Sequence, residues 1–331
     1  MDWKKWQLHF QLLNPDGLPI PYQVLQSEAL APTNIPALLF RVTIEPGEMT
    51  SFRIGVSESP RVSATAAVAP DGVDVLNGAL RCRKQVKLVL GDAATITSDD
   101  ESVFHARYEL IEDSSDTWSH GLDRYASSGF VTPVWSAAME ADRGPLSAAI
   151  VRSSALGHSE VREDWRVFAG EKFADLRLRI LWCEKGKILK LAIPLPHAVI
   201  RRTDGIMGES LVRQADGAER PVRDWILLEL EGGMRIGVVM PDVFAVDVST
   251  NCVRLTLLRS CLLAHHEPFD EPTVRGTYSD HGAHDFRFRI FTDRQVTADV
   301  LEHQAMMLQR PLAGADLTRG MHACLHEEKS R

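Results

Sequence analysis

The segment LRLRILW, Leu176–Trp182, alternates apolar and basic side chains over most of its length. Successive side chains of a β-strand point to opposite faces of the sheet, so this pattern predicts a half-buried strand. The apolar positions would face a core, and the arginines between them would face water. A strand of this kind needs partner strands to complete a sheet.

The alternation recurs in segments spread over the whole sequence. Further strands are predicted where it recurs, at Trp6–Leu12, Phe40–Ile44, Phe104–Leu110 and Phe286–Ile290. Short apolar runs predict others at Val86–Leu90, Ile188–Ile193, Trp225–Leu230, Met234–Met240 and Val253–Leu258. Many strands with turn residues between them and almost no helix pattern predict an all-β fold, a large sandwich.

The best helix pattern is Thr297–Gln309. Thr297 is a plausible N-cap, and Pro311 would stop the helix. The expected apolar stripe contains Val300, Leu301, Met307 and Leu308.

The chain of 331 residues is long enough for one large domain or two ordinary ones. A stretch rich in Ser, Ala, Val and Pro, Ser57–Asn77, is typical of a linker. We therefore expect a small β unit in residues 1–60, a large β-sandwich in 61–312 and a polar tail in 313–331.

Composition excludes several classes of function. Lys and Arg total 37 against 45 Asp and Glu, a net charge of -8, which argues against a general nucleic-acid binder and against docking on anionic membranes. No apolar run approaches the roughly 20 residues that span a bilayer. The N-terminus has no secretory signal pattern, and the five cysteines are scattered without a C-x-x-C, so a reduced, cytoplasmic setting is expected.

The segment DTWSHGLDRY, Asp116–Tyr125, contains an unusual density of chemically active groups. Aromatic faces stack on sugar rings, and carboxylates and arginine hydrogen-bond hydroxyls, so a sugar-contacting loop is one interpretation. The other is a loop pinned by its own Asp–Arg pairs with its aromatic residues as anchors. The candidate sugar contacts are Trp118, His120, Asp123 and Arg124.

A second polar region, His265–Asp285, contains four histidines and five acidic residues. Their irregular spacing is unlike a zinc site, so a solvated loop without metal is expected. Just before it, Arg254 and Arg259 lie in VRLTLLRS, Val253–Ser260, where each could meet a polyhydroxyl ligand or form an ion pair. The candidate contacts in this region are Arg259, Asp280 and His284.

DTWSHGLDRY resembles the D-T-W-[GS]-H-G-x-D-R-Y segment of glycoside hydrolase family 38, the α-mannosidases. Other segments resemble the family in the same order. These are Leu76–Leu80, Asp142–Ala148, Trp182–Pro196, Asp216–Trp225, Val253–Ser260, Asp280–Phe288 and Gln309–Leu312. The sequence departs from the family pattern at Cys261, where proline is usual, and at Val243–Ala245, where an aromatic-Gly-aromatic run is usual.

This resemblance implies the family's C-terminal half: a galactose-mutarotase-like β-supersandwich preceded by a small β-domain, for which Trp3–Val56 is the candidate. In the family, the catalytic residues and the zinc ligands lie in a preceding barrel, and no α/β alternation precedes Leu76. The resemblance therefore implies a chain without catalytic residues or a cofactor of its own. Zinc is expected only in a catalytic domain.

The implied partners are a carbohydrate, mannose-containing, and an α-mannosidase-type catalytic barrel in the same longer protein or in a separate subunit. Two alternatives stay open. One is a free-standing carbohydrate-binding module. The other is an aldose-epimerase-like enzyme on the same fold, which the missing N-H-x-[FY] segment disfavours.

Overall fold

The computed structural model describes residues 10–25, 37–45, 47–56, 73–76, 79–82, 86–98, 101–118, 121–127, 129–264 and 277–310. Within these ranges strands dominate, and α2 (Ala298–Gln309) is the single α-helix beside one short 3-10 turn, η1 (Glu231–Gly233). The predicted all-β fold is confirmed. No helix among these residues is long and apolar enough to cross a membrane.

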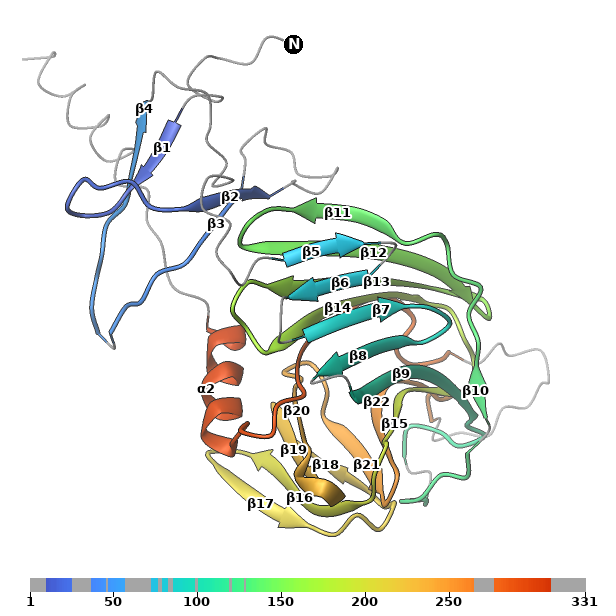
Figure 1. The fold of residues 1–331 in the computed structure, drawn as a ribbon. Helices are drawn as coiled ribbons and strands as arrows, with labels where there is room; N and C mark the ends of the chain where they lie inside the picture. The colour runs from blue at the N-terminus through green and yellow to red at the C-terminus, as the bar shows by residue number, and fades with distance from the viewer. Residues whose placement is uncertain are drawn as a thin grey trace, which may run out of the picture.

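Two large antiparallel sheets form the body of the molecule (Figure 1). The first contains, in spatial order, β18 (Glu219–Pro221), β21 (Ala245–Ser249), β22 (Cys252–Ser260), β15 (Lys187–Pro194), β9 (Glu101–Glu112), β8 (Ala94–Ser98), β7 (Val86–Leu90), β6 (Ala79–Cys82) and β5 (Val73–Leu76), with β10 (Phe130–Val131) paired to β9. The second contains β11 (Met139–Arg143), β12 (Ser147–Leu156), β13 (Ser159–Phe168), β14 (Phe173–Trp182), β23 (Gly282–Phe291), β20 (Arg235–Val239), β19 (Trp225–Leu230), β16 (Val199–Ile206) and β17 (Glu209–Arg213).

The two sheets face each other, with β5, β6 and β7 in front of β12, β13 and β14 in Figure 1. Their inner faces share one apolar core, to which Leu88 and Leu189 contribute from the first sheet and Leu178 and Phe288 from the second. In β14 the alternation predicted from LRLRILW is observed, because Leu176, Leu178, Ile180 and Trp182 are all buried. The predicted supersandwich is the observed architecture.

Helix α2 packs on the outer face of the second sheet, against β19 and β20 (Figure 1). The predicted N-cap is observed, since the Thr297 hydroxyl accepts a hydrogen bond from the backbone N–H of Val300. The predicted apolar stripe is wrong in two positions, because Val300 and Met307 are exposed. The residues facing the sheet recur every three to four positions, as one helix face requires, and are Ala298, Leu301, Ala305 and Leu308.

Two small sheets precede the sandwich: β1 (Phe10–Leu13) pairs with β4 (Arg53–Val56), and β2 (Tyr22–Leu25) pairs with β3 (Ala37–Phe40). The strand predicted at Phe40–Ile44 ends at Phe40. Its partner β2 begins at Tyr22, directly opposite Phe40, and the residue before it is Pro21, which has no N–H for the ladder.

Gln23 joins β2 to the second sheet. Its side-chain amide donates to Asp142 Oδ1 (3.2 Å) and to the carbonyl of Ser147 (3.1 Å). Its side-chain oxygen, Oε1, accepts from the backbone N–H groups of Leu146 (3.1 Å) and Ser147 (2.9 Å). The side chain is buried, so β2 and the β11–β12 turn form one packed unit.

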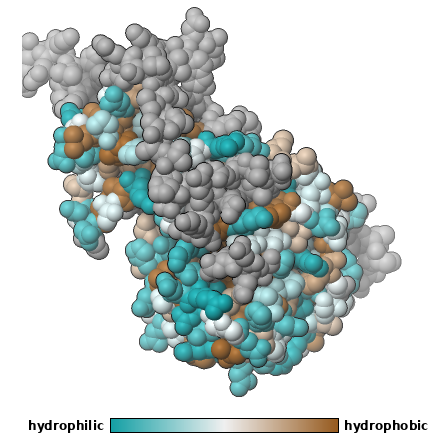
Figure 2. Space-filling model, in the orientation of Figure 1, coloured by the Kyte–Doolittle hydropathy of each residue, from teal (hydrophilic) through white to brown (hydrophobic). Residues whose placement is uncertain are grey.

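The predicted linker Ser57–Asn77 contains a strand, β5, at its C-terminal end, and residues 57–72 lie outside the described ranges. Figure 2 shows polar and apolar residues interspersed over the coloured surface of this view. The coloured residues in this view form no broad apolar face.

Candidate functional site

Arg259, near the end of β22, binds the segment that follows β9. Its Nε donates to Asp113 Oδ2 (2.7 Å), and its Nη2 donates to Ser115 Oγ (2.6 Å) and to the carbonyl of Asp116 (2.9 Å). Its backbone N–H donates to Asp280 Oδ2 (3.0 Å). We call these five residues the Arg259 cluster. It fixes the start of the predicted sugar loop on the first sheet.

Asp113 is buried, and burial by itself would raise the pKa of its carboxyl group. Hydrogen bonds from the Ser115 side chain and backbone and from the Arg259 guanidinium outweigh that effect, so the pKa of Asp113 lies below its ordinary value. The carboxylate is thus ionised and fully engaged, which suits an anchor better than a general acid.

The second polar region meets the same cluster through Asp280. The backbone of Asp280 has a positive φ of 58°, an uncommon conformation that turns the chain into β23. The neighbouring Ser279 hydroxyl donates to the carbonyl of Arg259 (2.6 Å), and His284 Nε2 lies 2.7 Å from the carbonyl of Asp280. Arg259, Asp280 and His284, predicted from distant segments, therefore lie together where β22 of one sheet approaches β23 of the other.

Trp118 lies at the tip of the loop with 71% of its surface exposed. Its backbone N–H donates to Asp116 Oδ1 (2.8 Å), a local turn that sets the direction of the chain. The preceding Thr117 donates its N–H to Leu262 O (3.0 Å) and accepts from Ala264 N at its hydroxyl (3.0 Å). The loop is thus held by its backbone while its indole faces outward. An exposed, positioned indole can stack on an apolar ring face.

Asp123 and Arg124 lie further along the loop. Arg124 Nη2 is 2.9 Å from Asp216 Oδ2, and its Nη1 is 3.3 Å from Asp123 Oδ1. The carbonyl of Asp123 accepts from the N–H of Glu219 (2.6 Å). The main ion pair therefore joins the loop to the β17–β18 connection, a partner that the sequence interpretation did not name. His120 lies outside the described residues.

Beneath the loop lies a row of charged residues, of which sequence analysis singled out Arg254 alone. Lys190 Nζ is 2.6 Å from Asp247 Oδ2 and 3.5 Å from Glu219 Oε2. Arg254 Nε is 2.6 Å from Asp247 Oδ1, and its Nη1 is 3.3 Å from Glu109 Oε2. We call these five residues the Lys190 row. Because the flanking Leu189 and Leu191 point into the core, Lys190 lies on the opposite face of the sheet, under the loop.

Tyr125 covers the Lys190 row. Lys190 Nζ lies 4.2 Å from the centre of its ring, and Arg254 Nη2 donates to its carbonyl (2.9 Å). Burial, followed by the negative charge of Glu219, raises the pKa of the Tyr125 hydroxyl well above its ordinary value, so it stays protonated. A signal for this row was available: Lys190 interrupts the otherwise apolar run Ile188–Ile193. Which charged residues of this row lie next to one another is set by the register of five strands.

The described residues do not fit a zinc site. No group of three His, Cys, Asp or Glu side chains among them lies close enough to hold a metal ion. His281 and His284 each direct Nε2 to a backbone carbonyl, of Glu184 and Asp280. Residues 265–276 of the predicted polar region lie outside the described ranges.

Part of the sequence that forms this site matches a known protein family. The family model described as "Glycosyl hydrolases family 38 C-terminal domain" matches residues 93–267, more than half of the chain. That range includes the loop, the Lys190 row and, except for Asp280, the Arg259 cluster. No curated protein matches the sequence.

Two solved structures from Enterococcus faecalis have the same fold. A protein in glycosyl hydrolase family 38 aligns with a TM-score of 0.65 at 10% identity, covering 93% of this chain and 42% of its own. An alpha-mannosidase from strain V583 aligns with a TM-score of 0.66 at 10% identity, covering 92% of this chain and 40% of its own. The chain thus spans about two fifths of the length of these structures. By its family match, the chain belongs to the glycosyl hydrolases family 38 C-terminal domain family.

Proposed function

We propose that this chain is the non-catalytic C-terminal β-region of an α-mannosidase-like glycoside hydrolase, and that it shapes a sugar site together with a catalytic barrel. The observation that supports this most directly is the exposed Trp118, oriented by the Arg259 cluster within the family-matched range. A scaffold alone does not need a largely exposed indole on a segment, Asp113–Trp118, that hydrogen bonds already hold in place.

The chemistry of the loop suits a mannose-containing carbohydrate. The indole of Trp118 offers an apolar surface to one face of a pyranose ring. Asp123 and Arg124, each with more than half of its side chain exposed, can exchange hydrogen bonds with ring hydroxyls. The chain would contribute contacts and shape, and the barrel would contribute the reacting groups and zinc.

The Arg259 cluster has a different role in this proposal. Arg259 uses its guanidinium on Asp113, Ser115 and Asp116, so it positions the loop rather than contacting sugar. On the other side, Asp280 accepts from the backbone N–H of Arg259, and His284 contacts the carbonyl of Asp280. Of the seven candidate contacts, Trp118, Asp123 and Arg124 are therefore the ones we propose as ligand contacts among the described residues.

A free-standing carbohydrate-binding module is the second candidate. The same exposure of Trp118 favours it, because stacking on the indole requires no group from a barrel. The two candidates differ in whether sugar binding needs the partner.

The test is Trp118→Ala, with Phe244→Ala as the matched control, since Phe244 is also exposed (66%) and lies in a different turn. Binding of an α-mannoside is measured by calorimetry, and hydrolysis of an aryl α-mannoside is measured for the chain alone and together with a family 38 catalytic barrel. We expect Trp118→Ala to weaken binding or barrel-dependent hydrolysis about tenfold, with melting temperature unchanged.

The control should behave like the wild type. Binding by the isolated chain would favour the module, and hydrolysis only with the barrel would favour the α-mannosidase region. Hydrolysis by the isolated chain that is lost on changing one of its residues would contradict the proposal.

A further inference from the structure

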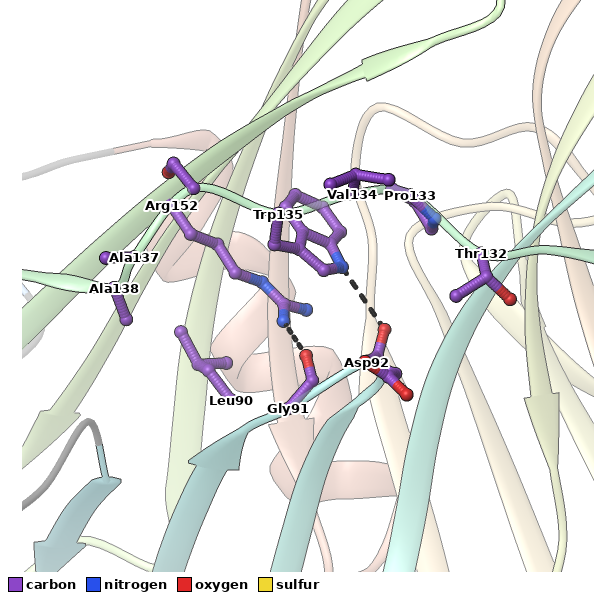
Figure 3. Close-up of a pocket in the computed structure, with 11 residues that line it drawn as sticks. Leu90, Gly91, Asp92, Thr132, Pro133, Val134, Trp135, Ala137, Ala138 and Arg152 are labelled. Carbon is purple, nitrogen blue, oxygen red and sulfur yellow. Dashed lines mark hydrogen bonds between the residues drawn. The ribbon is translucent and has the colours of Figure 1, made fainter.

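A cavity lies between the β7–β8 turn and the segment Thr132–Ala138 (Figure 3). Its volume of about 460 Å³ falls in the range of about 300–1,000 Å³ that is usual for small-molecule sites. Gly91 and Asp92 lie on one side, Trp135 lies on the other, and Arg152 of β12 reaches between them. None of these residues belongs to the Arg259 cluster or the Lys190 row.

Arg152 is buried and its charge is already balanced. Its Nε donates to Glu163 Oε2 (2.7 Å), and both side chains are almost wholly buried. Glu163 also accepts from the hydroxyl of Tyr108 (2.8 Å) and from Nε1 of Trp165 (2.8 Å). Glu163 and Arg152 form a buried ion pair that is neutral as a unit.

One nitrogen of the Arg152 guanidinium makes no hydrogen bond to the described residues. Nη1 donates to the carbonyl of Gly91, but Nη2 is buried and has no hydrogen-bond partner among the described residues. A buried donor without an acceptor costs free energy, and native proteins rarely leave one. Such a donor beside a cavity is a candidate hydrogen-bond partner for an acceptor oxygen of a ligand.

Trp135 covers this nitrogen. Its ring centre lies 3.8 Å from the guanidinium carbon of Arg152, and its Nε1 donates to the carbonyl of Asp92 (3.2 Å). The segment Thr132–Ala138, which contains Trp135, is not part of a β-strand. Ser136 attaches it to β12, because its backbone N–H donates to the carbonyl of Ser153 (2.8 Å). A small shift of the indole would open Nη2 to the cavity and leave the segment attached.

We propose that this cavity binds a neutral polyhydroxyl ligand, a single pyranose ring, with a ring or hydroxyl oxygen accepting from Arg152 Nη2. Trp135 supplies the apolar face, and the hydroxyl of Thr132 and the carboxylate of Asp92 supply polar contacts at the rim. The ligand is neutral because Glu163 already matches the charge of Arg152 and Asp92 adds a negative charge. An anion bound in this cavity would find no unpaired positive charge, because Glu163 already pairs with Arg152.

The experiment titrates methyl α-mannoside, methyl α-glucoside and inorganic sulfate into the chain, followed by calorimetry and by tryptophan fluorescence. The Trp118→Ala variant serves as the background, so that binding at the proposed loop site is removed first. In that background we expect binding of a neutral glycoside with a Kd on the order of millimolar, together with a fluorescence change from the displaced Trp135.

Adding Trp135→Leu or Thr132→Val should weaken this binding about tenfold, whereas adding Phe244→Ala should leave it unchanged. Thr132 is exposed, so its variant keeps the test valid if Trp135→Leu impairs folding. The proposal is overturned if the background protein binds no neutral glycoside, if both cavity variants bind as well as the background, or if sulfate binds there in place of the glycosides. Failure of the loop proposal would appear separately, as wild-type binding that Trp118→Ala leaves unaltered.

Discussion

Several charged residues in the described part of this protein are buried, and most of these have an opposite charge beside them. Lys190 and Asp247 are both almost fully buried at 2.6 Å from each other. Removing one partner of such a pair leaves a charge in a poorly solvated place, which typically costs about 3–5 kcal/mol. Asp113 in the Arg259 cluster is a milder case, because Arg259 keeps part of its side chain in contact with water.

Asp113→Asn tests the anchor role at this scale. A carboxyl group whose folded pKa is lowered stabilises the protein above its unfolded pKa, and this stability is lost as pH falls through the folded pKa. We expect the variant to lose about 1–3 kcal/mol of unfolding free energy near neutral pH. Its stability should also depend less on pH below about pH 4 than that of the wild type. Urea unfolding over a range of pH measures both.

The exposed Asp16→Asn serves as the control and should change stability by less than about 0.5 kcal/mol. If Asp113→Asn kept the wild-type acid profile, the Asp113 carboxylate would not be the anchor described here.

At the scale of elements, the helix and the second sheet approach so closely that one position must be glycine. A Cβ built on Gly237 of β20 would lie 2.7 Å from Leu301 Cδ2 of α2. Leu301 is itself fully buried, between the sheet and the rest of the helix, so it has little room to move. The position of α2 on the sheet therefore depends on a residue without a side chain.

Gly237→Ala should lower the unfolding free energy by about 1–3 kcal/mol through overpacking. Gly91→Ala is the matched control, because the nearest atom to its Cβ is 3.9 Å away, and it should be nearly neutral. Combining Gly237→Ala with Leu301→Ala should cost less than the sum of the two single changes, since the smaller side chain relieves the clash. Fully additive costs in this double-mutant cycle would rule out the contact as the cause.

At the scale of the whole molecule, the small sheets and the sandwich are joined by a few specific contacts. Gln23 makes five hydrogen bonds to the β11–β12 turn and its neighbours. Gly144 gives it space, because a Cβ there would lie 2.3 Å from the Gln23 amide carbon. The small β unit is thus packed against the sandwich through one buried amide.

Gln23→Ala should loosen this junction without unfolding the sandwich. The backbone N–H groups of Leu146 and Ser147 would lose their acceptor, so their hydrogen exchange should become about tenfold faster or more. Gln11→Ala, on an exposed face of β1, should leave that exchange unchanged. Global melting of the sandwich at a much lower temperature would show that the two parts fold as one unit, contrary to this expectation.

The sequence by itself determined the all-β class, several of the core strands, the helix with its Thr297 cap, and the family. Alternation with period two predicts a strand locally, since it depends only on which face of the chain is apolar. The segment Leu176–Trp182 was predicted correctly for this reason. The motif DTWSHGLDRY likewise marked the loop that the structure places over the Lys190 row.

What the tertiary structure decided is which distant residues meet. Arg254 could form an ion pair by its sequence, but its burial between Asp247 and Glu109 follows from the register of β9, β15, β22 and β21. The helix stripe of Ala298, Leu301, Ala305 and Leu308 depends on the angle at which α2 meets the sheet, which local hydrophobicity does not specify. The unpaired Nη2 of Arg152 is visible only in three dimensions, because burial and hydrogen-bond partners come from chain segments far apart in sequence.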